Sequence, residues 1–169
     1  MQRASLPCCL SIALLFLSLV GLGRVPEAAA ADDSVSRSSL KGLKAIGLIV
    51  EKMSPEAEQE GVTREQVQKD VELRLKDSGL PVAKEAAGFL YVTVQTTRSP
   101  DASGHSYSVG LEFTQPVLLV RDTQILVLGT TWSLFATGTV AQGKLSLARV
   151  DVVNLVDKFV SAYRSVNPR

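Results

Sequence analysis

Residues 107–136 read YSVGLEFTQPVLLVRDTQILVLGTTWSLFA, two alternating segments joined by a short polar connection at 121–124. Regular alternation of apolar with polar residues predicts two strands, each with one buried face. The apolar positions are Tyr107, Val109, Leu111, Phe113, Val117 and Leu119 in the first segment and Leu126, Leu128, Trp132, Leu134 and Ala136 in the second. We therefore predict a long β-hairpin at the centre of the molecule, with its bulky residues sheltered beneath helices.

The register of this hairpin follows from matching the exceptions to the alternation as well as the apolar residues. The pairs expected in that register are Phe113 with Trp132, Leu111 with Leu134, Leu119 with Leu126, and Gln115 with Thr130. Pro116 then faces Gly129, which predicts a bend or bulge at that point.

The sequence on either side of the hairpin supplies the remaining elements. In chain order it predicts a strand at 45–50, a loop at 52–61, a helix from the capping box of Thr63 and Gln66 to Gly79, a strand at 89–97, a loop at 98–104 and a helix at 145–166. These patterns predict an α+β fold, in which a mainly antiparallel sheet of about four strands carries two helices on one face as a two-layer sandwich. The strands at 45–50 and 89–97 are expected to be parallel if they pair, because a helix connects them. Residues 43–169 are expected to form a single domain.

The N-terminal segment at 1–31 has the three parts of a cleaved secretory signal: a basic start, an apolar run at 6–23 and small residues at Ala28–Ala31. Cleavage after Ala30 or after Ala31 fits equally well. Residues 32–42, rich in Asp and Ser, then predict a flexible lead-in. We expect a periplasmic or secreted location. The alternative is anchoring in the inner membrane by residues 6–23, which lie at the lower length limit for a spanning helix.

Charge and cysteine content exclude several classes of function. From Asp32 onward the chain carries equal numbers of basic and acidic side chains, which gives no electrostatic basis for binding nucleic acid. Cys8 and Cys9 are the only cysteines, and both lie within the signal. The mature chain is therefore predicted to have neither a disulfide nor a cysteine-based metal site, and no cofactor is expected.

Candidate catalytic residues are few. His105 is the only histidine, and we interpret it as an exposed loop residue because nothing in its local sequence orients the ring as a general base. Glu112 has outward parity in the hairpin, whereas Glu51 stands at a strand end and is left open as a buried acid. The sequence thus predicts no catalytic residue and no set of metal ligands.

One cluster is a candidate for ligand binding. Thr130 and Thr131 place hydroxyl groups beside Trp132, the only tryptophan, and Phe113 faces it from the other strand. Together these four residues could line a ligand groove. The alternative is that the threonines are ordinary strand residues and that Trp132 belongs to the core.

Three functions follow as hypotheses. The first is a non-catalytic exported protein that acts as a binding or assembly domain, with another envelope protein or a lipid as its partner. The second is a carrier of a small ligand or lipid in an apolar pocket between sheet and helices. The third is a hydrolase built around His105, which needs a carboxylate and a nucleophile within hydrogen-bond reach of the ring.

Five short stretches of the mature chain carry a family resemblance. They are Val71–Leu75, Leu90–Val92, Tyr107–Val109, Thr131–Ser133 and Val166–Pro168. On these the chain resembles small secreted bacterial proteins of unknown function, and the order of its elements is similar to that of envelope domains in secretion and transport assemblies. The resemblance implies a Gram-negative periplasmic home rather than an activity, because a fold does not imply a function.

Overall fold

The computed structural model describes residues 32–101 and 103–168. Its elements are α1 (Ser34–Ser38), β1 (Gly47–Val50), α2 (Pro55–Gln59), α3 (Arg64–Ser78), β2 (Phe89–Arg98), β3 (Gly104–Leu119), β4 (Asp122–Ala141), the 3-10 turn η1 (Leu145–Leu147) and α4 (Ala148–Val166). The predicted signal and the alternative membrane anchor lie outside the described residues. Within those residues, no helix combines the length and apolar character needed to cross a bilayer.

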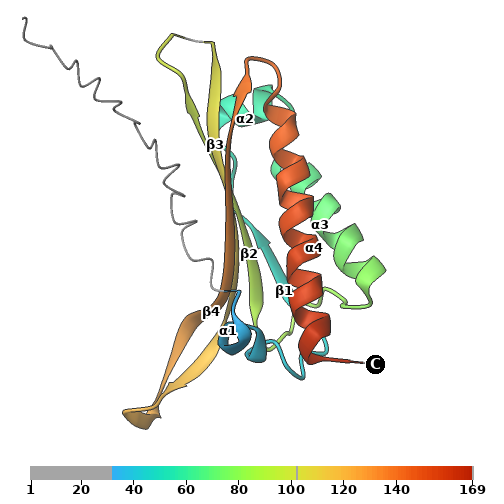
Figure 1. Cartoon of the computed structure of the whole chain (residues 1–169), viewed down its shortest axis with the longest axis vertical. Coiled ribbons are helices and arrows are strands. Elements are labelled where there is room, and N and C mark those ends of the chain that lie inside the picture. Colours follow the sequence, from blue (N-terminus) through green and yellow to red (C-terminus); the bar gives the residue numbers. More distant parts are fainter. Residues whose placement is uncertain (1–31, 102, 169) are drawn as a thin grey trace, which may run out of the picture.

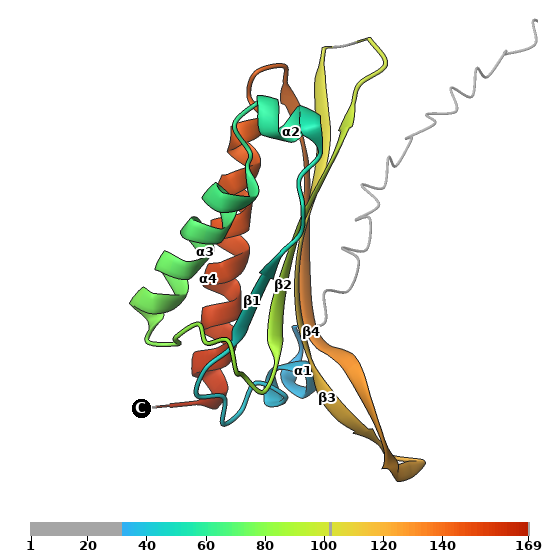
Figure 2. The same cartoon turned by 180° about the vertical axis from the view of Figure 1, so that it is seen from behind.

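The four strands form one sheet in the order β1-β2-β3-β4. β1 runs parallel to β2, and the other two pairs are antiparallel. Helices α3 and α4 lie side by side on one face of this sheet, and no helix of the described residues lies on the opposite face (Figure 1 and Figure 2). The predicted α+β sandwich is confirmed, as is the parallel pairing of its first two strands.

The hairpin register is confirmed in one half and wrong in the other. Phe113 pairs with Trp132 and Leu111 with Leu134, as expected. Beyond them the register shifts by one, so that Thr114 rather than Gln115 faces Thr130. The other corrected pairs are Gln115 with Gly129, Pro116 with Leu128 and Leu119 with Asp122. The shift of one residue is caused by a β-bulge in which Thr131 is the extra residue, and it replaces the irregularity expected at Pro116 and Gly129. A second irregularity, between Leu118 and Leu119, brings Leu119 opposite Asp122.

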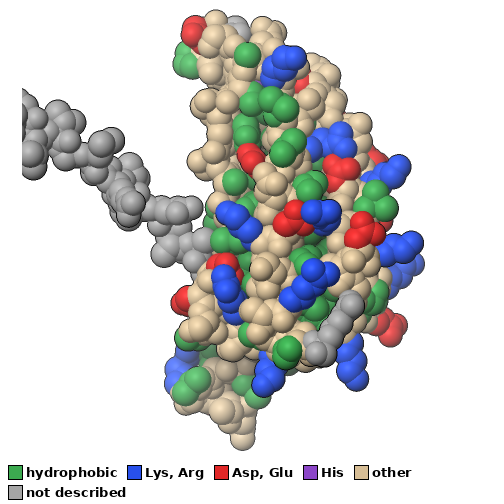
Figure 3. Space-filling model, turned by 45° about the vertical axis from the view of Figure 1, so that its right-hand side comes forward, with side chains coloured by type: hydrophobic (Ala, Val, Ile, Leu, Met, Phe, Trp, Pro, Cys, Tyr) green, Lys and Arg blue, Asp and Glu red, His purple; other side chains and the backbone are tan. Residues whose placement is uncertain are grey.

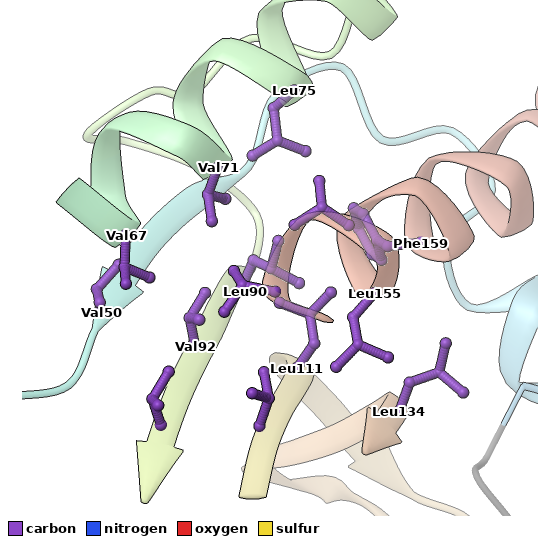
Figure 4. Close-up of a cluster of buried hydrophobic side chains, with 14 of the residues drawn as sticks. Val50, Val67, Val71, Leu75, Leu90, Val92, Leu111, Leu134, Leu155 and Phe159 are labelled. Atoms are coloured by element: carbon purple, nitrogen blue, oxygen red, sulfur yellow. The ribbon is translucent and has the colours of Figure 1, made fainter. Parts of the chain in front are cut away.

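The core lies between the sheet and the two long helices. Leu90, Val92 and Leu111 project from the sheet toward α3 and α4, and Leu155 and Phe159 project from α4 toward the sheet (Figure 4). The ring of Phe159 meets Trp132 edge to face at a centroid separation of 5.0 Å and lies 6.0 Å from Phe113. All three rings are fully buried, so they form the aromatic centre of the molecule.

Local signals fix both ends of helix α3. Thr63 and Gln66 form the predicted capping box, in which each side chain bonds the other's backbone amide. Gly79 ends the helix with φ of +81°, a left-handed conformation that glycine adopts without steric penalty.

The segment 52–61, which precedes α3, is not the loop that its polar sequence predicts. It contains α2, with Pro55 in its first turn, where the missing N–H of proline has no partner to lose.

Residues 32–42 do not form the flexible lead-in that their composition predicts. Asp33 caps the short helix α1, which packs against α4 and β4, and Leu40 is fully buried. Asp32 bonds Arg37 through both carboxylate oxygens and accepts a hydrogen bond from Trp132 Nε1 at 2.8 Å. The prediction fails because the partner that orders this segment, Trp132, is a hundred residues away.

A partly buried polar contact joins the sheet to α4. The Tyr107 hydroxyl donates to Asp151 Oδ2 at 2.6 Å, and this bond, together with partial burial, raises the pKa of Tyr107 to about 12. Because folding raises the pKa of Tyr107, its protonated hydroxyl stabilises the folded state at every pH below the pKa that this tyrosine has in the unfolded chain. That stabilisation is lost as the pH rises through the folded value.

We therefore expect a late step of tyrosine ionisation near pH 12, which belongs to Tyr107. Tyrosinate absorbance during an alkaline titration measures this, and the late step should be absent in Tyr107→Phe. The Tyr91→Phe variant is the control and should keep it. A late step that survives in Tyr107→Phe would contradict the assignment.

Candidate functional site

Beyond the bulge, β3 and β4 continue as a two-stranded ribbon that extends past the helical layer (lower end of Figure 1 and Figure 2). We call residues 115–129 the arm. Among residues 32–101 and 103–168 no helix covers it, and the turn at Val120–Arg121 forms its tip. A two-stranded hairpin is only marginally stable in water by itself, so packing against another surface would stabilise such an arm.

The arm is apolar on both faces. Pro116 pairs with Leu128 and Leu118 with Leu126, and side chains at directly paired positions share a face. Leu118 is 56%, Leu126 64% and Leu128 68% exposed. Val127 and Ile125 are also exposed, and Val120 at the tip is 98% exposed. Soluble monomers rarely expose a contiguous apolar surface of this kind unless it binds something.

Polar contacts at the bulge fix the base of the arm. Thr131 Oγ1 lies 3.0 Å from both Ser39 Oγ and Gln115 Nε2. Gln115 Nε2 also donates to the Ser39 carbonyl at 3.1 Å. The end of α1 is thereby fastened to both strands at the point where they leave the helices. The arm consequently departs from a rigid, hydrogen-bonded base.

The helical layer has a different surface. Lys and Arg side chains alternate there with Asp and Glu (Figure 3), and Arg149 bonds Asp70 at 2.7 Å between α4 and α3. Arg74 and Asp157 form a second pair between the same helices. The arm carries Arg121 and Asp122 as its only charged residues, both at the tip. The contrast marks the arm, rather than the helices, as the candidate binding surface.

The predicted ligand groove is not formed. Phe113 and Trp132 are fully buried in the core, so they cannot line a groove that is open to a ligand. Thr131 belongs to the bulge, and Thr130 is exposed, with its Oγ1 3.2 Å from that of Thr114. The four residues are neighbours, as expected, but they play structural roles.

The arm residues were missed although the sequence holds a signal for them. Strict alternation stops at Pro116, and two uninterrupted apolar runs follow, at 117–120 and 125–128. Runs of this kind are typical of strands buried on both faces. Here the run at 125–128 is exposed throughout, and Leu118 and Val120 are exposed in the other run. That mismatch between sequence and environment distinguishes the site.

His105 is not the exposed loop residue that its sequence predicts. Its side chain is buried at the start of β3, and Nε2 lies 2.7 Å from Glu60 Oε1. Glu60 Oε2 also accepts from the amides of Gly143 and Leu145. Burial works against the charge on Glu60, but the bond from His105 and the two amides outweigh it and lower the pKa of this carboxyl.

The Glu60–His105 pair joins three segments that are distant in sequence. It ties the end of α2 to β3 and to the turn that follows β4. No serine or threonine hydroxyl bonds His105 in the part of the chain that the structure describes. Glu51, left open by the sequence, is exposed at the end of β1. The geometry is that of a structural clasp without a nucleophile.

Cavities and metal ligands add no second site. A shallow hollow of about 470 Å³ on the helix-free face is lined mainly by Ser and Thr side chains of the three long strands. Within residues 32–101 and 103–168, no three His, Cys, Asp or Glu side chains stand close enough together to hold a metal ion. The arm therefore remains the strongest candidate.

Comparison of the sequence with protein-family models and with curated proteins finds no match. The class of function must accordingly come from the geometry of the arm and its base.

Proposed function

We propose that this chain is a non-catalytic exported binding protein, of the assembly or adaptor kind, which acts in the periplasm or outside the cell. Its arm docks on an apolar surface of a partner protein. The observation that carries the proposal is the row of large apolar side chains on a ribbon that no helix of the described chain covers.

Docking would convert this exposed surface into a buried one. Full burial of one large apolar side chain is worth about 1.5–3 kcal/mol relative to full exposure. Leu118, Leu126 and Leu128 are each more than half exposed, so covering them together contributes several kcal/mol. The bonded base of the arm adds to this, because a preorganised segment loses less conformational freedom on binding.

The tip of the arm favours a protein over a bilayer as the partner. Arg121 and Asp122 are exposed there, beside Val120. Inserting the arm tip-first into a membrane would carry both charges toward the hydrocarbon, where each costs about 2.5–3.5 kcal/mol at the centre. A protein groove can leave the tip in water while it covers the flanks.

Two observations support this order of the hypotheses. His105, on which a hydrolase would depend, is engaged with Glu60 in a partly buried clasp. The rings of Phe113, Trp132 and Phe159 fill the space that a carrier would need between sheet and helices. The carrier hypothesis therefore ranks second.

Site-specific photo-crosslinking in cells tests the proposal. A photoreactive amino acid in place of Leu126 should give a protein adduct of defined mass. The same residue in place of Leu73, which is 50% exposed on α3, is the matched control and should give none. Equal adducts at both positions, or no protein adduct at Leu126, would refute docking by the arm. Recovery of one defined lipid on Leu126 would favour the carrier instead.

A further inference from the structure

The arm ends in a sheet edge that lacks the usual protection. β4 is the last strand of the sheet, so one side of its backbone has no strand beside it in the described chain. Natural edge strands are commonly blocked by charged side chains or by proline. Asp122 is the only charged residue in the twenty residues of β4, and no proline occurs there.

Part of this edge is already covered. Ser39 Oγ lies 3.4 Å from the Thr131 carbonyl, so α1 protects the strand at the bulge, and the bulge itself interrupts any continuous pairing. The regular segment between tip and bulge, Leu126–Thr130, has no other segment of the described chain along its outer side. It is also the segment with the most exposed leucines.

We propose that a second copy of this chain occupies the open edge, with Leu126–Thr130 of the two copies paired antiparallel across a two-fold axis. This inference rests on the proposed function, since it identifies the partner of the arm. Identical strands related by a two-fold axis perpendicular to their sheet run antiparallel, and the same surface then meets itself. Backbone bonding would supply the register, and the apolar side chains on both faces would supply the stability.

Side-chain character and charge both favour this occupant. Leu126 and Leu128 are each more than half exposed. In the two-fold pairing these leucines of the two copies lie side by side on one continuous sheet, so each row covers part of the other. Arg121 and Asp122 cancel on each arm, and the chain from Asp32 onward has no net charge, so two copies do not repel.

The oligomeric state of the full-length gene product, purified from the cell envelope, tests the inference. Light scattering over a range of concentrations should give the mass of a dimer. Replacing Leu126 and Leu128 together by lysine places like charges across the axis and should weaken dimerisation by about tenfold or more. The Leu73→Lys variant is the control and should remain dimeric.

Fluorescence of Trp132 shows whether the lysine variant is folded, because this ring lies in the core and outside the arm. An unchanged spectrum with a monomeric mass supports the inference. Should the spectrum change, single Leu126→Ser and Leu128→Ser variants replace the double variant, and a dimer that persists in both folded variants would overturn the inference.

Cysteine scanning locates the axis. Residues 32–169 contain no cysteine, so one introduced at successive positions from 124 to 130 bonds only its counterpart in a second copy. A disulfide requires Cα atoms within about 7 Å, so cross-linking should peak at one or two adjacent positions and be absent at residue 73.

The two proposals fail in distinguishable ways. A protein that stays monomeric at every concentration, while Leu126 photo-crosslinks to a different protein, overturns the dimer and leaves the proposed function standing. A monomer with no arm-specific adduct overturns both.

Discussion

Phe159→Ala is expected to lower the free energy of unfolding by about 3–5 kcal/mol, the range found when a large buried aromatic side chain is truncated. Phe159 is fully buried and lies against both Trp132 and Phe113, so it packs α4 against the two long strands. Its removal deletes apolar burial, leaves a cavity and breaks both aromatic contacts.

Denaturant unfolding followed by Trp132 fluorescence measures this loss, since the only tryptophan is in direct contact with Phe159. Leu73→Ala on the exposed face of α3 is the control and should change stability by no more than about 0.5 kcal/mol. A loss below about 1 kcal/mol for Phe159→Ala would mean that the aromatic centre is not the core of this fold. Measurement at low protein concentration keeps self-association by the arm out of the comparison.

The central hairpin and the two long helices could be predicted because their signals are local. The capping box of Thr63 and Gln66 and the alternation through Leu111 and Phe113 lie within a few residues of the structure they specify. Such patterns determine which face of each element is buried, and two buried faces of this size must pack together.

The corrections at the bulge, at His105 and in residues 32–42 involve partners that are far apart in the chain. The bulge at Thr131 is stabilised by Ser39, and His105 is buried by its bond to Glu60. Neither partner can be recognised from the sequence around the residue it orders. A short polar segment such as α1 likewise has no periodicity of its own, and it becomes ordered through side chains supplied by β4.

The arm was misjudged for a different reason. Apolar runs at 117–120 and 125–128 predict burial, and that prediction assumes that the same chain provides the cover. The arm bends away from the helical layer, and no helix of the described residues covers these runs (Figure 2). The failure of that expectation is itself the evidence for a binding surface.

The second large effect is expected at Asp32. Trp132 Nε1 is buried and donates to Asp32 Oδ1 at 2.8 Å, so Asp32→Ala leaves the indole N–H without its acceptor. An unsatisfied buried donor costs about 1–3 kcal/mol, which should appear as a lower midpoint of denaturant unfolding. Asp32→Asn keeps an acceptor oxygen and is the control, with a smaller loss. Equal stability of wild type and Asp32→Ala would show that α1 does not anchor to the sheet through this bond.

The same residue predicts an acid dependence. The bond from Arg37 lowers the pKa of Asp32 below its ordinary value of 3.8, against the opposing effect of burial and with help from the Trp132 bond. Ionised Asp32 therefore stabilises the folded state at pH values above the pKa that this carboxyl has in the unfolded chain. The stabilisation is lost as the pH falls through the lower pKa of the folded state. Wild type should therefore lose more stability than Asp32→Asn below about pH 4. Cleavage after Ala30 or Ala31 would retain Asp32, so the predicted processing site and the anchoring of α1 are compatible.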